Sequence, residues 1–208
     1  MLSTDMLARV RTLIDEATAS YWQDSEIYSA LSDGQTEAVN FIYGLYEAKK
    51  KADPNTILPD VLSPLTKSLS NSIVSSYTIT IPTDLFKLIA IEITNGTNPK
   101  VAAYRRDFSV ETIFYQYNSL MNGTNNISYF SNAANYFFNQ LLNGSYNIYY
   151  IENPPAISSG VNPTVGSAIH DIICLYAFSQ VLKKDQRLEE STQNFNQFLS
   201  LLAKYMAI

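Results

Sequence analysis

The chain has little of what metal, redox and disulfide sites need: one cysteine and one histidine among 208 residues. A single cysteine, Cys174, excludes an intrachain disulfide. His170 lies four residues earlier, on the same helix face, but two ligands do not make a zinc site, which takes three or four. The pair also lacks an exposed position and an orienting third group, so a thiol nucleophile is not indicated. We interpret both residues as core residues, with no metal.

Charge is also scarce, at 16% of residues, and the formal net charge is −5. The acidic excess lies mainly in the first 53 residues, and no segment is strongly basic. Tight nonspecific binding of nucleic acid depends on clustered Lys and Arg, so the composition argues against it. Because no phosphate loop, dinucleotide fingerprint or metalloprotease motif is present, we expect no cofactor and no enzymatic activity.

Long apolar runs are absent too. None approaches the roughly 20 residues of a membrane helix. The first 11 residues include Asp5 and two arginines but no apolar stretch of a secretion signal. We therefore expect the chain to fold inside a cell, without a membrane.

What is present begins with helical periodicity in residues 1–53. Apolar residues recur at helical spacing over 3–19 and again from Ile27 to about residue 50. Ser3 or Thr4 is the expected cap of the first helix and Asp24 that of the second. We expect Trp22 to pack over the corner between them, and Gly34 to mark a kink or break.

The same spacing returns in residues 158–208. It predicts two helices joined by the polar residues 183–187, which is typical of an antiparallel helical hairpin. Each helix has one apolar stripe that other parts of the chain must cover. The stripes are formed by Ile169, Ile172, Ile173, Tyr176 and Leu182, and by Leu188, Phe195, Phe198, Leu199, Leu202 and Tyr205.

The middle of the chain changes period. Residues 54–76, with three prolines and many serines, are predicted to be a connector with a short helical turn near 62–69. Alternation over 77–157 predicts an inserted β-rich subdomain with one internal helix at 109–121. Its clearest feature is a predicted hairpin of 135–142 and 145–151, joined at Asn143-Gly144, the pair that a type I′ turn favours. Shorter strands are expected at 77–81, 87–94 and 100–104, with a tight turn at Thr83-Asp84.

These patterns predict an α+β fold: a helical bundle from the N- and C-terminal helices with an inserted antiparallel β subdomain. The predicted divisions are 1–53, 54–76, 77–157 and 158–208.

Aromatic residues are the strongest candidates for contact with another molecule. Tyr136 and Phe138 alternate with Phe137, so both sides of the predicted hairpin are aromatic. One hypothesis is that another chain covers one side, because Tyr and Phe are favoured at interface centres. The alternative is that a larger sheet covers both sides internally. The candidate interface residues of this region are Tyr129, Phe130, Tyr136, Phe137, Phe138 and Tyr149, with Arg105 and Arg106 as either a solvated strand end or a salt-bridge contact.

Three short motifs resemble a known family. They are Trp22-x-Asp24-x-Glu26-Ile27 at a helix start, Tyr-x-Ile-x-Ile-Pro-x-Asp at 77–84, and Ile-Glu-Asn-Pro at 151–154. A helix, a Lys-Lys-Asp joint and a last amphipathic helix follow. In order and spacing this succession resembles the head–tail connector (adaptor) proteins of tailed bacteriophages, of the podovirus type with a β insertion. The segment 104–134 has no clear counterpart.

The resemblance implies a structural virion protein that is made in the host cytoplasm and placed at the head–tail junction. It implies a homo-oligomeric ring, typically of twelve copies, that binds the portal protein and the next tail component. DNA would pass transiently through the ring's channel, and the mild acidity suits a channel to which DNA must not stick. Tyr205 and Ile208 become candidate portal contacts, because the last helix or tail often has that role in the family.

Two other functions stay open at this point. Exposed Tyr and Phe with many Asn side chains could form a carbohydrate- or ligand-binding module, either by itself or as another tail component. A hydrolase using two carboxylates from Asp107, Glu111 or Glu152 is the third, although their spacing does not support it.

Overall fold

A computed structural model describes residues 1–16, 21–53, 55–95, 101–105, 127–132 and 134–206. The chain forms two compact units, a helical unit of Met1–Leu65 with Pro154–Ile208 and a sheet unit of Thr66–Asn153. Helices at both ends of the chain and a largely antiparallel sheet between them confirm the predicted α+β class.

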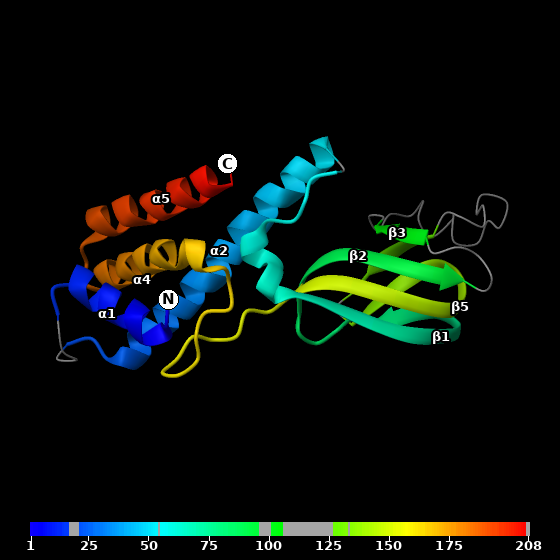
Figure 1. Ribbon diagram of the computed structural model, residues 1–208, viewed down its shortest axis with the longest axis horizontal. Coiled ribbons are helices and arrows are strands. Elements are labelled where there is room, and N and C mark those ends of the chain that lie inside the picture. The colour runs from blue at the N-terminus through cyan, green and yellow to red at the C-terminus, as the bar shows by residue number, and fades with distance from the viewer. Residues whose placement is uncertain (17–20, 54, 96–100, 106–126, 133, 207–208) are drawn as a thin grey trace. The chain divides into compact units, whose positions relative to one another are not determined.

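The helical unit is arranged around α4, which contacts α1, α2 and α5 (Figure 1). Its apolar stripe supplies Ile173 and Ala177 to the core, and Phe198 and Leu202 of α5 pack on the same core. The predicted C-terminal helical hairpin is therefore confirmed. The elements of this unit are α1 (Ser3–Leu13), α2 (Asp24–Ala52), two 3-10 turns (Asp60–Leu65 and Ser167–Ile169), α4 (His170–Lys184) and α5 (Leu188–Tyr205).

Gly34 does not break α2, which runs without interruption past it. A Cβ added at Gly34 would lie 2.9 Å from Cδ1 and 3.2 Å from Cβ of Tyr176 on α4. The glycine thus lies at a close contact between α2 and α4, and the predicted break was wrong. Gly44, on the same helix, has open space at this position.

The expected helix caps also differ from the structure. The first helix begins at Ser3, whose backbone N–H donates to Oδ1 of Asn162, so neither Ser3 nor Thr4 caps it. Similarly, α2 begins at Asp24 itself, and the Asp24 carboxylate accepts hydrogen bonds from Arg11 instead. The N-cap positions are held by Leu2 and Gln23 instead of the predicted residues.

The sheet unit has the strand order β1-β5-β2-β3-β4, and β4 also pairs with the first part of β5, so the sheet closes on itself. The strands share an apolar core that includes Ile91, Phe138 and Ile148, and Ala103 of β3 packs against it. The strands are β1 (Thr66–Thr80), β2 (Leu85–Asn95), β3 (Val101–Arg105), β4 (Ser128–Ser131) and β5 (Asn135–Glu152).

The predicted hairpin at Asn143-Gly144 was wrong, because β5 continues through both residues. Gly144 lies opposite Ile73 of β1 on one side and Asn95 of β2 on the other. A turn here would remove the pairing with both neighbours, so tertiary pairing overrides the local preference of Asn-Gly for a turn.

The connector prediction was wrong for residues 66–76, which are the first part of β1. These residues escaped notice because almost all are exposed, so they show no alternation of apolar and polar positions. The sheet unit accordingly begins at Thr66 and ends at Asn153, not at 77 and 157. The predicted short helix near 62–69 is a 3-10 turn at Asp60–Leu65, and the predicted helix 109–121 lies outside the described residues.

Candidate functional site

Four side chains form a compact charged cluster at one end of the sheet unit. The ammonium group of Lys67 donates to the carboxylate of Asp84 at 3.1 Å and forms an ion pair with Glu152. The hydroxyl of Tyr150 donates to the other oxygen of Asp84 at 3.0 Å. We call Lys67, Asp84, Tyr150 and Glu152 the neck cluster, because it joins the start of β1, the turn before β2 and the end of β5.

The contacts within the neck cluster shift the pKa values of Lys67, Asp84 and Tyr150. Hydrogen bonds to Glu152 and Asp84 raise the pKa of Lys67 above its usual value. Burial would raise the pKa of Asp84, but hydrogen bonds from Lys67 and Tyr150 outweigh it and lower that pKa. Burial, followed by the bond to Asp84, raises the pKa of Tyr150. Each of these three shifts moves a pKa further from neutral pH, so the arrangement suits a structural clasp and not acid–base chemistry.

The corner between α1 and α2 is built by the Trp22 motif. Arg11 is buried and donates from Nη2 to the backbone carbonyl of Trp22 at 2.9 Å and from Nε to Asp24 at 3.1 Å. Trp22 is itself buried, as expected, and the Nζ of Lys184 lies 5.3 Å from the centre of its ring. Glu26 accepts the N–H of Gln23, which satisfies one of the open backbone donors at the helix start.

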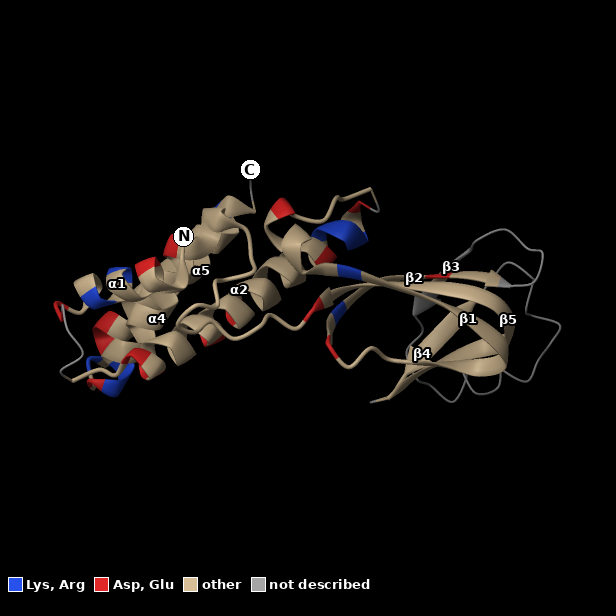
Figure 2. Cartoon of the chain, turned by 60° about the horizontal axis from the view of Figure 1, so that its bottom comes forward, with Lys and Arg blue, Asp and Glu red and all other residues tan. Residues whose placement is uncertain are grey.

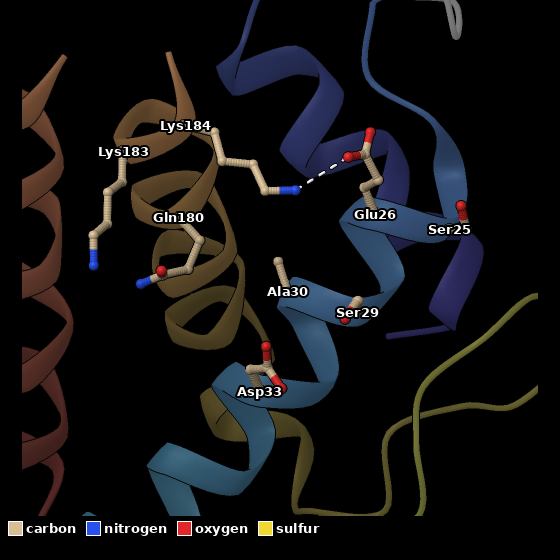
Figure 3. A pocket seen from close by; sticks show the side chains of 8 residues that line it. All are labelled: Ser25, Glu26, Ser29, Ala30, Asp33, Gln180, Lys183 and Lys184. Carbon is tan, nitrogen blue, oxygen red and sulfur yellow. Dashed lines mark hydrogen bonds and ion pairs between the residues drawn. The ribbon is translucent and has the colours of Figure 1, made fainter. Parts of the chain in front are cut away.

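A hollow of about 510 Å³ lies beside this corner, between α2 and α4 (Figure 3). Glu26 and Asp33 line it from α2, and Gln180 and Lys183 from α4. Glu26 and Lys184 form an ion pair across one end at 3.1 Å, and the bond lowers the pKa of Glu26. The hollow offers separate acidic and basic groups but no activated nucleophile, so it does not indicate catalysis.

His170 and Cys174 lie in the core, as the sequence predicts. Nε2 of His170 donates to the carbonyl of Val165 at 2.9 Å, and Nδ1 accepts from the amino group of Met1 at 3.0 Å, which together fit one neutral tautomer. Burial raises the pKa of the Cys174 thiol to about 12, so no reactive thiolate forms at neutral pH.

Other kinds of site find little support in the described residues. No group of three or more His, Cys, Asp or Glu side chains is placed there to hold a metal ion. Within the same residues, no helix has both the length and the apolar character to cross a membrane. Of the carboxylates considered for hydrolysis, Glu152 belongs to the neck cluster, while Asp107 and Glu111 lie outside the described residues.

The aromatic interface prediction changes most. Tyr129, Tyr136 and Phe138 are 7%, 3% and 1% exposed and pack together in the core of their own sheet. They are therefore too buried to contact a partner in this conformation, and the alternative of an internally covered sheet holds for this face. The ligand-binding hypothesis loses the same three rings as stacking surfaces.

The remaining candidates are more accessible. Phe130 and Phe137 are partly exposed and stack on each other, with ring centres 5.1 Å apart. The Tyr149 hydroxyl donates to Glu92 at 3.0 Å, and Tyr205 is half-buried on α5. Arg105 ends β3, whereas Arg106 and Ile208 lie outside the described residues. The structure therefore brings Phe130 and Phe137 together but does not gather the candidates into one site.

The sequence reasoning missed the neck cluster, although a signal was present. Asp84 follows Pro82 by two residues and Glu152 precedes Pro154 by two, so both acids stand at strand ends marked by proline. Lys67 gave no comparable signal, because the strand that carries it was read as connector.

Comparison with known proteins adds no family. No protein-family model matches the sequence, and no curated protein matches it.

Proposed function

We propose that this protein is a head–tail connector of a tailed bacteriophage, a structural component of the virion and not an enzyme. Copies of the chain form a ring, typically of twelve, between the portal protein and the next tail component. The ring leaves a channel through which DNA passes.

The meeting of two motifs at the neck cluster carries the proposal. Asp84 ends the motif 77–84 and Glu152 belongs to the motif 151–154, and both bind Lys67. The third motif builds the corner of the helical unit, where Trp22 and Asp24 both bind Arg11. All three motifs thus have architectural roles in a helical unit that carries an inserted sheet, which is the arrangement expected of the podovirus-type connector.

The charge distribution is compatible with this role. Charged residues lie mostly along the helices, while most strand residues are uncharged (Figure 2). The net charge of −5 gives the chain little attraction for the DNA backbone. Transport through a channel requires such weak binding, since each tight phosphate contact would retard the DNA.

Native mass spectrometry of the purified chain, alone and mixed with the portal protein encoded beside it, tests the proposal. A ring, or a portal complex with many copies of the chain, is the expected result. A chain that stays unbound in the presence of folded portal protein would refute the connector function. A double variant, Arg11→Met with Asp24→Asn, tests the role of the corner in the helical unit. It should lose binding to the portal protein and, at the same time, lose the packing of Trp22, which tryptophan fluorescence measures.

A further inference from the structure

A second hollow of the helical unit, of about 690 Å³, lies between α2 and residues 156–159. We call it the loop hollow. Tyr28 and Ile157 give it apolar surface, and its wall is otherwise formed mainly by serines. Hydrogen bonds fix the two sides to each other: the hydroxyl of Ser32 donates to the carbonyl of Tyr28 at 2.8 Å and accepts the N–H of Ile157 at 2.9 Å. The hollow is therefore already formed in the free chain.

Both charged residues of the loop hollow are acidic. Asp24 is used within the unit, because its carboxylate accepts a hydrogen bond from Arg11 at 3.1 Å. Asp33 is exposed, and no described residue forms a hydrogen bond or an ion pair with it. The hollow thus combines apolar surface with one carboxylate that is available to a cation.

The complementary surface lies just beyond the other end of α2, in residues 55–59, which we call the tip. Ile57 in the tip is 85% exposed, the highest value for a large apolar side chain among the described residues. A local turn holds it there. The N–H and hydroxyl of Thr56 donate to the carbonyl of Asp53 at 3.1 and 2.7 Å, and the N–H of Asn55 donates to Oδ1 of Asp53 at 3.0 Å. The exposed apolar group is therefore presented by an ordered segment.

A cation stands beside the tip, in the last turn of α2. Three lysines occur there, and two have contacts within the chain. Lys49 donates to the carbonyl of Met206, and the Nζ of Lys50 lies 5.4 Å from the centre of the Tyr46 ring. Lys51 is exposed, and no described residue forms a hydrogen bond, an ion pair or a ring contact with it. One apolar side chain and one available cation thus match what the loop hollow offers.

We propose that the tip of one copy of this chain enters the loop hollow of the next copy, with Ile57 against Tyr28 and Lys51 paired with Asp33. Along α2, Asp33 and Lys51 are 18 residues apart, or about 27 Å, so they cannot meet within one chain. Residues 49–60 carry three lysines and two aspartates, whereas both charged residues of the hollow are acidic, so charge also favours this pairing.

The contact is head to tail, because it joins two different surfaces of the same chain. Repetition of such a contact gives a closed ring or an open filament. Its role as the contact between neighbours in the connector ring rests on the proposed function. The contact itself rests only on the two surfaces.

Sedimentation velocity of the full chain over a range of concentrations tests the contact, and we expect association that increases with concentration. Ile57→Ser should weaken the association about tenfold or more, because it removes the apolar side chain that the hollow buries. The matched control is Val74→Ser in the sheet unit, where the side chain is 75% exposed. It should change the affinity less than about twofold.

Charge reversal tests the pairing of the two charged residues. Lys51→Glu and Asp33→Lys each place like charges opposite each other and should each weaken the association about fivefold. Both substitutions in one chain restore opposite charges, so the affinity should return to within about twofold of the original. Lys204→Glu, at an exposed lysine of α5, makes the same charge change as Lys51→Glu and should have less than about a twofold effect.

Three results would overturn the proposal: a chain that stays monomeric at all concentrations, equal effects of Ile57→Ser and Val74→Ser, and no rescue in the double charge reversal. Circular dichroism establishes that each variant is folded. If Ile57→Ser weakens binding to the portal protein but not self-association, the tip contacts the portal protein and the proposal is wrong. Self-association without portal binding refutes the connector function and leaves this contact standing, whereas portal binding without self-association does the reverse.

Discussion

Substitution of Gly34 by alanine tests how closely α2 and α4 are packed. The added methyl group would meet the Tyr176 side chain at 2.9 to 3.2 Å, closer than carbon atoms ordinarily approach. The Tyr176 ring cannot swing away freely, because it also contacts Phe195 and Phe198 at ring-centre distances of 6.0 and 5.2 Å. Overpacking of this kind costs about 1–3 kcal/mol.

The helix itself favours the substitution. Alanine is better than glycine inside a helix by about 0.5–1 kcal/mol. Taking the middle of both ranges, we expect Gly34→Ala to lower the free energy of unfolding by about 1 kcal/mol. Gly44→Ala is the matched control on the same helix, and since its Cβ would meet nothing within 4 Å it should stabilise by about 0.5–1 kcal/mol.

Urea unfolding followed by Trp22 fluorescence measures both variants, because the only tryptophan lies buried in the helical unit. In a Tyr176→Ala background the ring atoms that meet the new methyl group are gone, so Gly34→Ala should lose most of its cost. If Gly34→Ala stabilised as much as Gly44→Ala, or if its cost were unchanged by Tyr176→Ala, the close approach would be refuted.

Three further predictions concern single groups. Burial lowers the pKa of His170 below 6.5, so on lowering the pH the unfolded chain binds a proton at this residue before the folded chain does. The helical unit should therefore be most stable above about pH 6.5 and lose stability below it. Urea unfolding at pH values from about 5 to 8 should show a smaller loss of stability at low pH for His170→Gln than for the unsubstituted chain. Lys67→Met should raise the pKa of Asp84, measured by NMR, and lower the thermal midpoint of the sheet unit, whereas Lys87→Met should do neither. Phe198→Ala removes a fully buried ring and should cost about 3–5 kcal/mol in urea unfolding, a value that a cost below 1 kcal/mol would contradict.

Elements whose side chains face a core were predictable from the sequence. Ile173 and Phe198 belong to the helical spacing that predicted the α4–α5 hairpin, and Ile91 and Ile93 to the alternation that predicted β2. Burial on one face of an element gives its apolar residues such a regular spacing. The first half of β1 could not be found in this way, since an edge strand exposed on both faces has no such period. Nothing in the spacing of its own residues indicates that it pairs with β5.

The missed features of the candidate site share a different cause. The neck cluster joins residues 67, 84 and 152, and no local pattern predicts an ion pair over such separations. The aromatic residues were misjudged for the converse reason. A hairpin of two strands could not have buried Tyr136 and Phe138, but the closed sheet that β4 completes does so, and this closure depends on pairing that alternation alone does not specify.

In each unit, the segment where the chain enters and the segment where it leaves are bonded within that unit. This explains how a sheet can be inserted into a helical protein. On the helical side, Gln35 of α2 donates to the carbonyl of Pro155 and accepts the N–H of Thr164, so the returning chain is fixed to the helix. Gly166 also donates its N–H to the carbonyl of Val61 at 2.9 Å, just before the chain leaves the unit. On the sheet side, the neck cluster joins the first residues of β1 to the last residues of β5. Because neither set of bonds uses residues of the other unit, a change in the length or surface of the sheet leaves the core contacts of the helical unit intact.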